Sequence, residues 1–233
     1  MSLRISAKDL GQLALDDFCP RCFWVKRKVK VPFQIPFPGI FSSIDSYTKK
    51  TVEGYFKIHR QLPNFIRTIG VPNQIINIHR KTFRFEHQGV ILTGDPDLLF
   101  LKKDGTLGIV DYKTARYTEN QDELLPMYNV QLNGYALISE SVFCKKVSTM
   151  HLVYFEPPYP KEALKVGHKN VNNLGFMMPF TSNIHKIDKD TKMVINLMDE
   201  AKKIMDSSTP PNGKEGCKEC QNLINLLQLP GLK

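Results

Sequence analysis

The chain carries the sequence GDPDLLF at residues 94–100 and the sequence IVDYKT at residues 109–114. Apolar residues accompany both stretches, so each is predicted to be a strand, and the Asp-Gly pair in the short segment between them is typical of a hairpin turn. A hairpin of this kind would bring Asp97 and Asp111 close together. These two stretches therefore predict a pair of carboxylates at neighbouring positions of a sheet.

The second stretch also places a lysine beside these carboxylates. Side chains alternate between the two faces of a strand, so Asp111 and Lys113 point to one face and Tyr112 to the other. Carboxylate oxygens are the ligands that Mg²⁺ and Mn²⁺ prefer. Two carboxylates and a lysine suit metal-assisted hydrolysis of a phosphodiester, with the lysine orienting a water or neutralising developing charge. A solvated acidic hairpin is the alternative, but an apolar strand leading into the Asp-x-Lys sequence favours a site.

These residues resemble the PD-(D/E)xK nuclease superfamily. Pro96-Asp97 and Asp111-Tyr112-Lys113 match its signature, and the surrounding sequence is most similar to the RecB/Cas4-like branch. The resemblance implies a restriction-endonuclease-like core of mixed α/β (α+β) class, with a central mixed β-sheet flanked by helices. It also implies that Asp97, Asp111 and the backbone carbonyl of Tyr112 hold Mg²⁺ or Mn²⁺, and that Lys113 positions the attacking water.

A helix motif follows the lysine. Apolar residues recur at helical spacing over residues 120–139, and Gln131 and Tyr135 lie four apart on one face of this predicted helix. The resemblance implies that Gln131 is a catalytic residue facing the site and that Tyr135 binds substrate. Taken alone, Gln131 would be interpreted as an ordinary exposed polar residue of a helix.

Members of the superfamily usually draw a further metal ligand from a helix before the strands. Residues 41–60 are predicted to form such a helix, and they contain three chemically suitable side chains, Asp45, Glu53 and His59. The sequence does not distinguish among them, and Asp95 is a candidate for an outer carboxylate beside the site.

Four of the five cysteines form two C-x-x-C pairs, Cys19 with Cys22 and Cys217 with Cys220. Two such pairs make a complete tetrahedral thiolate set, so one metal centre would join segments 17–24 and 215–222 near the two termini. The first residues lack a continuous apolar core, so we expect no signal peptide and an intracellular, reducing location, which favours metal over disulfides. The fifth cysteine, Cys144, is expected to be a small core residue.

For the identity of this metal we expect a [4Fe–4S] cluster, with Zn²⁺ as the alternative. The spacing of the cysteine pairs favours Zn²⁺, whereas the resemblance to Cas4-like nucleases implies a [4Fe–4S] cluster. Those nucleases usually place one cysteine near the front of the chain and three near the back, and the two-and-two division here departs from that pattern.

Length and charge agree with one nucleic-acid-binding domain. The 233 residues suffice for a substantial core, and we expect a single domain over 1–233 with its core at about 41–206. The formal net charge of +9 suits contacts with a phosphate backbone. No apolar window is long enough for a membrane span, so we expect a soluble protein, cytoplasmic or nucleoid-associated, with no membrane contact.

The remaining patterns complete the expected order of elements. Three prolines make residues 31–39 an extended connector. Helices are predicted over 6–17 and 188–206 in addition to the two above. Strands are predicted over about 74–86, 90–101, 107–113, 147–156 and 174–181, in one mixed sheet.

The sequence as a whole predicts a metal-dependent deoxyribonuclease, most simply an exonuclease acting on DNA ends or single strands in repair, recombination or CRISPR adaptation. Two other interpretations remain. One is a non-catalytic nucleic-acid-binding subunit with a structural cysteine centre, and the other is a processing nuclease that works only with protein partners. Four properties are left open by the sequence: exonuclease or endonuclease action, the polarity of digestion, the preference for DNA or RNA, and the oligomeric state.

Overall fold

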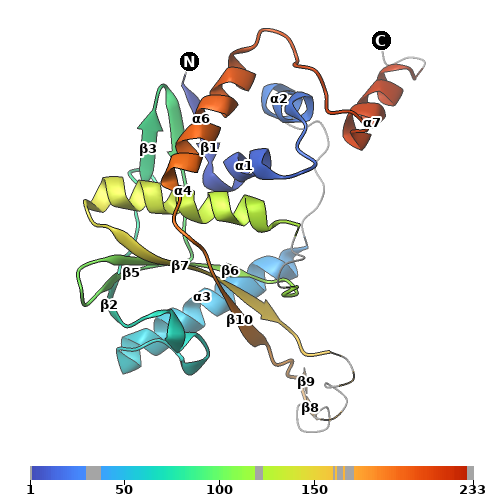
Figure 1. Cartoon of the computed structure of the whole chain (residues 1–233). Helices are drawn as coiled ribbons and strands as arrows, with labels where there is room; N and C mark the ends of the chain where they lie inside the picture. Colours follow the sequence, from blue (N-terminus) through green and yellow to red (C-terminus); the bar gives the residue numbers. More distant parts are fainter. Residues whose placement is uncertain are drawn as a thin grey trace.

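A five-stranded mixed sheet lies at the centre of the computed structural model, which describes residues 2–29, 38–118, 123–159, 161, 165 and 171–229 (Figure 1). The strand order is β10-β7-β6-β5-β2, with β6 and β7 parallel and the other neighbours antiparallel. The strands are β2 (Pro72–Ile75), β5 (Leu98–Lys102), β6 (Leu107–Lys113), β7 (Val147–Glu156) and β10 (Thr181–Lys186). The expected mixed α/β fold with a central mixed sheet is thereby confirmed.

Helices cover both faces of this sheet (Figure 1). Helix α4 (Leu125–Phe143) lies on one face, and α3 (Gly39–His59) lies on the other together with the 3₁₀ helix η2 (Asn64–Ile69). Successive residues of β6 enter the two cores alternately, Ile109 on the α4 side and Val110 on the α3 side. Because both faces of the sheet are buried, the sequence of β6 is apolar up to Asp111 and Lys113, the two polar residues of the site.

A second, three-stranded sheet corrects the single sheet expected from the sequence. Its order is β1-β4-β3, formed by β1 (Leu3–Ser6), β4 (Val90–Thr93) and β3 (Arg84–His87). The strands predicted over 74–86 and 90–101 are therefore each divided between the two sheets. The second division falls at Gly94–Asp97, where Pro96 lacks the N–H that a continuous ladder would need.

The N-terminal segment also differs from the helix predicted over 6–17. Ser6 caps a helix, with its hydroxyl accepting from the Asp9 N–H at 3.0 Å, but it is also the last residue of β1. The helix α1 (Ala7–Gly11) continues only as the 3₁₀ helix η1 (Gln12–Ala14). β1 exists because it pairs with β4, more than eighty residues away in the chain, and a short sequence window does not contain that partner.

The C-terminal half contains the last helices and strands. Helix α6 (Thr191–Asp206) packs on α4, and β10 begins at Thr181, after a small hairpin of β8 (Val171–Asn172) and β9 (Gly175–Phe176). The strand predicted over 174–181 therefore corresponds to β9, and the strand that joins the main sheet comes later. Cys144 is exposed at the end of α4, in a left-handed conformation with φ 53°, and is not a core residue.

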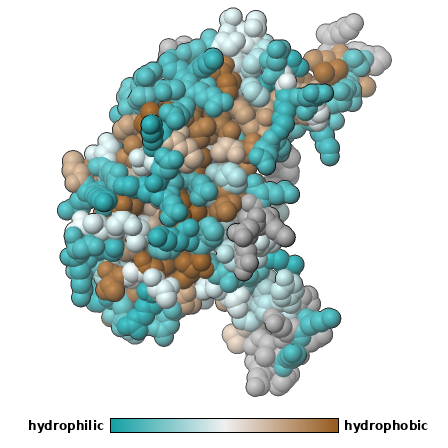
Figure 2. All heavy atoms as spheres, viewed as in Figure 1, coloured by the Kyte–Doolittle hydropathy of each residue, from teal (hydrophilic) through white to brown (hydrophobic). Residues whose placement is uncertain are grey.

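Segments from near both ends of the chain come together beside α1 (Figure 1). Helix α2 (Pro20–Val29) and helix α7 (Lys218–Leu227) contact each other, and Figure 2 shows the outline of the molecule hollowed between this region and the β8–β9 hairpin. Most of the connector expected at 31–39 falls outside the described residues. Within the part of the chain that is described, no helix is long and apolar enough to cross a membrane.

Two glycines allow a matched test of core packing. Gly108 lies opposite Phe100 in the β5–β6 hairpin, and a Cβ atom at this position would collide with the fully buried phenyl ring. We expect Gly108→Ala to lower the free energy of unfolding by about 1–3 kcal/mol, measured by urea denaturation.

The control is Gly54→Ala in α3, where an added Cβ meets nothing within 4 Å. Higher helix propensity should stabilise this variant by about 0.5–1 kcal/mol. Equal effects of the two substitutions would contradict the packing described for the hairpin.

Candidate active site and four-cysteine centre

The β5–β6 hairpin brings the two predicted aspartates together. Leu98 pairs with Val110, so Asp97 lies beside Asp111 at the end of the hairpin. The Tyr112 N–H donates to Asp97 Oδ2 at 2.6 Å. This bond attaches the residue just before β5 to the end of β6 and fixes the orientation of the Asp97 carboxylate.

Lys113 lies on the same face as Asp111, as the alternation of the strand predicts. Its Nζ is 2.6 Å from Asp111 Oδ2 and donates to Gln131 Oε1 at 2.9 Å. It also lies 4.0 Å from the centre of the Tyr128 ring, a cation–π contact that the sequence did not reveal. With only 12% of its side chain exposed, Lys113 is held in one position by three groups.

Helix α4 contributes the predicted Gln131 and Tyr135, one turn apart. Gln131 Nε2 donates to the Tyr135 hydroxyl oxygen at 2.7 Å and, in a longer contact of 3.4 Å, to Asp111 Oδ1. The Tyr135 ring is buried against Gly94, where an added Cβ would come within 2.5 Å of it. A glycine before the first aspartate therefore lets the helix approach the site closely.

The other side of the site is formed by α3. Lys49 Nζ lies 2.7 Å from Asp97 Oδ1 and 2.8 Å from Asp45 Oδ2. Sequence reasoning missed Lys49, although its spacing of four from Asp45 on a helix was a usable signal. Among the three further ligand candidates, Asp45 thus adjoins the site through Lys49.

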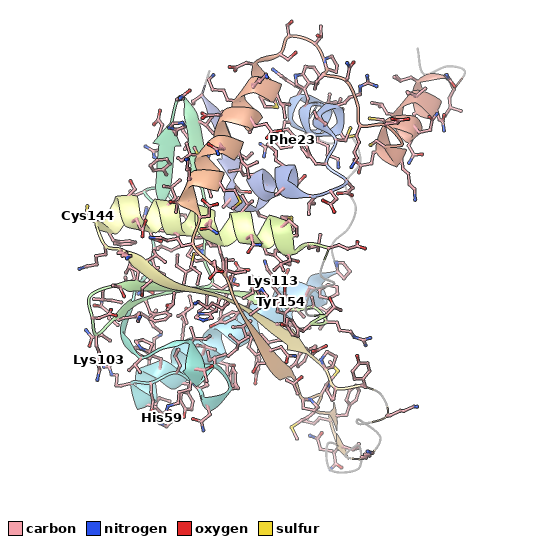
Figure 3. All side chains as sticks on the ribbon, in the orientation of Figure 1. Phe23, His59, Lys103, Lys113, Cys144 and Tyr154 are labelled. Carbon is pink, nitrogen blue, oxygen red and sulfur yellow. The ribbon has the colours of Figure 1, made fainter. Side chains whose placement is uncertain are left out.

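The other two candidates lie elsewhere on α3. His59 is at the far end of α3 from Lys113 (Figure 3). Burial, together with the charges of Asp97, Glu53 and Asp111, raises the pKa of the Tyr112 hydroxyl, so the Glu53 charge acts on that buried phenol. Asp95, expected as an outer carboxylate, forms an ion pair with the exposed Arg80.

Burial and mutual repulsion dominate the electrostatics of the two aspartates. Burial and the Asp111 charge raise the pKa of Asp97 to about 7, although Lys49 and the Tyr112 N–H oppose the shift. Burial also raises the pKa of Asp111, against the effect of Lys113. Two adjacent carboxylates that are costly to ionise are a favourable setting for a divalent cation, so the donor set fits Mg²⁺ or Mn²⁺.

The four predicted cysteines also converge. Three sulfur–sulfur separations are 3.5 Å for Cys19 and Cys220, 3.6 Å for Cys22 and Cys217, and 3.5 Å for Cys22 and Cys220, and all four sulfurs lie within 4.8 Å of one another. These separations exceed a disulfide bond of about 2.05 Å. The cluster could hold a metal, as the sequence predicts.

Backbone and side-chain contacts fix the two cysteine segments against each other. The Lys214 N–H donates to Cys19 Sγ at 3.3 Å, and the Arg21 side chain donates to the Pro211 carbonyl at 3.1 Å. Burial disfavours the Cys19 thiolate, but hydrogen bonds from the Cys22 and Lys214 N–H groups and from neighbouring thiols lower its pKa to about 6. A thiolate is the form that binds metal.

The raised pKa of Asp97 predicts a pH-dependent stability. An unfolded aspartate ionises near 3.8 and the folded one near 7, so the folded state binds more protons between these values and loses stability as pH rises through this range. In buffer without added divalent metal, we expect Asp97→Asn to gain thermal stability relative to the parent as pH rises from 4 to 7. Asp104→Asn, an exposed position in the turn of the same hairpin, should show no such gain, and parallel curves for Asp97→Asn and the parent would contradict the assignment.

Comparison with known proteins agrees with this geometry. The family model described as the PD-(D/E)XK nuclease superfamily matches residues 19–222, which include both cysteine pairs and the whole carboxylate site. No curated protein matches the chain significantly. A solved structure titled "Crystal structure of SSO0001" is similar at 15% identity and a TM-score of 0.43, covering 99% of this chain and 87% of that one. The chain therefore belongs to the PD-(D/E)XK nuclease superfamily.

Proposed function

We propose that this chain is a metal-dependent deoxyribonuclease whose active site is formed by Asp97, Asp111, Lys113 and Gln131. The observation that carries the proposal is the convergence of these four side chains, two carboxylates, one ammonium and one amide, at the end of the β5–β6 hairpin. Members of the superfamily are usually metal-dependent nucleases, which supports the same conclusion.

Each group has a role that follows from its contacts. Asp97 and Asp111 hold Mg²⁺ or Mn²⁺, with the Tyr112 backbone carbonyl as a third ligand. A bound ion of this kind polarises the phosphoryl group and lowers the pKa of a coordinated water. Lys113 is held at the edge of the carboxylate pair, where its ammonium group can orient the attacking water and stabilise charge on the phosphate.

Gln131 and Tyr135 support this arrangement from α4. Gln131 contacts both Asp111 and Lys113, so it fixes their relative orientation. We place Tyr135 behind Gln131 as a positioning residue for the site, because its ring is buried and its hydroxyl accepts a hydrogen bond from the Gln131 amide. This refines the substrate-binding role that the resemblance implied for Tyr135.

The proposed substrate is DNA with ends or single-stranded character. The net charge of +9 supports a polyanionic substrate, and the RecB/Cas4-like sequence motifs support exonuclease action in repair, recombination or CRISPR adaptation, alone or with protein partners. A non-catalytic DNA-binding subunit is the alternative. Against it, Lys113 retains contacts with Asp111, Gln131 and the Tyr128 ring, an arrangement with no evident use in a site that has lost its chemistry.

We further propose that the four cysteines bind one Zn²⁺ and that the single domain over residues 1–233 is closed by this centre. A tetrahedral ion with Zn–S bonds of about 2.3 Å separates its sulfurs by about 3.8 Å, close to the 3.5–3.6 Å found for three pairs. A [4Fe–4S] cluster binds each cysteine through a different iron and spreads the sulfurs further apart. The sulfur separations therefore favour zinc over the cluster that the resemblance implied.

The nuclease proposal predicts a metal-dependent loss of cleavage. With Mg²⁺ or Mn²⁺, Asp111→Asn and Lys113→Met should each cut labelled single-stranded DNA at least roughly 10²-fold more slowly than the parent. Asp104→Asn and Lys103→Met, in the turn of the same hairpin, are the matched controls and should retain full activity. Cleavage by Asp111→Asn at the parental rate would disprove the site, and DNA binding without cleavage by the parent in any divalent metal would support the alternative function. Parallel assays on duplex DNA and RNA define the substrate.

The zinc proposal predicts metal content and colour. The purified protein should be colourless and contain about one zinc per chain by elemental analysis. Cys220→Ser should lose the metal and melt at a lower temperature, because the clamp between the termini opens, whereas the exposed Cys144→Ser should change neither property. Stoichiometric iron, with broad absorption near 400 nm, would contradict zinc and support the cluster.

A further inference from the structure

Lys49 connects two carboxylates that do not otherwise share a contact. It reaches from α3 to Asp97 Oδ1 at 2.7 Å while remaining 2.8 Å from Asp45 Oδ2, one turn earlier on its own helix. The sequence motifs of the site do not include Lys49, yet it touches one of the two carboxylates that the proposed function assigns to metal binding. A metal ion that binds Asp97 would therefore compete with Lys49 for this carboxylate.

The oxygens of Asp97 are both in use. Oδ2 accepts the Tyr112 N–H at 2.6 Å, and Oδ1 carries the Lys49 ammonium group at 2.7 Å. The backbone bond is part of the hairpin and cannot be released without distorting it. A divalent cation that binds Asp97 therefore meets a positive charge, the Lys49 ammonium group, in direct contact with the same carboxylate.

The two lysines of the site differ in their freedom to move. Lys113 is held by Asp111, Gln131 and the Tyr128 ring and is 12% exposed. Lys49 is 34% exposed, and its second partner, Asp45, is 43% exposed. Lys49 can therefore leave Asp97 and stay paired with Asp45, whereas Lys113 is ion-paired with a single carboxylate, Asp111, among the described residues.

We propose that Lys49 is an exchangeable counter-ion, which neutralises Asp97 in the metal-free protein and moves to Asp45 when Mg²⁺ or Mn²⁺ binds. Lys49 thereby weakens metal binding by the substrate-free enzyme. This inference rests on the proposed function, since it requires Asp97 to be a metal ligand. It makes Lys49 a positioning residue that competes with the metal and assigns Asp45 the role of receiving it.

The test is Mn²⁺ binding to the zinc-loaded full chain without DNA, measured by electron paramagnetic resonance at pH 8.5. We expect Lys49→Met to bind Mn²⁺ roughly tenfold more tightly than the parent, which corresponds to about 1.4 kcal/mol. Lys50→Met is the matched control, because Lys50 is the adjacent, exposed lysine of the same helix. It should change the affinity little, and any change should disappear in 0.5 M KCl, as expected for a screened charge.

The outcomes separate this inference from the proposed function. Tighter binding by Lys49→Met that persists in 0.5 M KCl supports the exchange, and parental or weaker binding by a folded Lys49→Met overturns it while leaving the nuclease site intact. If Lys49→Met does not fold, Lys49→Gln provides the same measurement with a side chain that can still donate to Asp97. No Mn²⁺ binding by either the parent or the variants would refute the metal site itself, and the inference with it.

The role of Asp45 gives a second, independent readout. In Asp45→Asn the ammonium group loses the carboxylate that receives it, so Mn²⁺ should bind more weakly than to the parent, and the double variant with Lys49→Met should recover the tight binding of Lys49→Met alone. Simple long-range charge effects would add in the double variant and leave it weaker than Lys49→Met. An additive result would therefore contradict the exchange between Asp97 and Asp45.

Discussion

The repulsion between two neighbouring buried carboxylates, Asp97 and Asp111, is the constraint on which this structure depends. Burial raises the pKa of both groups, and the Asp111 charge further raises the pKa of Asp97. An ion pair with a lysine offsets part of the cost of ionisation at each carboxylate: Lys49 pairs with Asp97, and Lys113 pairs with Asp111. A pair of carboxylates arranged in this way is poorly satisfied by the protein alone and is suited to a divalent metal ion.

The groups that stabilise the two carboxylates come from different helices and strands, and each must lie within hydrogen-bond distance of its partner. The Tyr112 N–H comes from the strand that carries Asp111, Lys49 from α3 on one side and Gln131 from α4 on the other. The close approach of α4 depends on Gly94, whose missing side chain leaves room for a tyrosine ring. The site therefore lies where the central sheet ends between two helices, and the packing of both helices controls its geometry.

The four-cysteine centre has a structural role, which differs from that of the carboxylate site. It joins a helix near one end of the chain to a helix near the other. The Lys214 N–H donates to Cys19 Sγ, and the Arg21 side chain donates to the Pro211 carbonyl, which holds the two segments together. Closing so long a loop restricts the unfolded chain strongly, so a metal bound there would stabilise the whole fold. In the proposed enzyme this centre supports the domain, while the carboxylate site carries out the chemistry.

The sequence alone determined the local elements and the chemistry they carry. The alternation of β6 placed Asp111 and Lys113 on one face, helical spacing placed Gln131 and Tyr135 together, and the cysteine spacing predicted a four-sulfur cluster. These features follow from the periods of strands and helices, which are fixed by backbone geometry over a few residues.

Only the tertiary structure decided which distant segments meet. It divided residues 90–101 between two sheets, added a strand at Leu3–Ser6 that exists through its pairing with β4, and brought Lys49 to Asp97. None of these contacts has a periodic mark in the sequence, because each depends on how whole elements pack against one another. The candidate site residues Asp97, Asp111 and Lys113 could therefore be predicted from the sequence, whereas the contact of Lys49 with Asp97 depends on the tertiary structure.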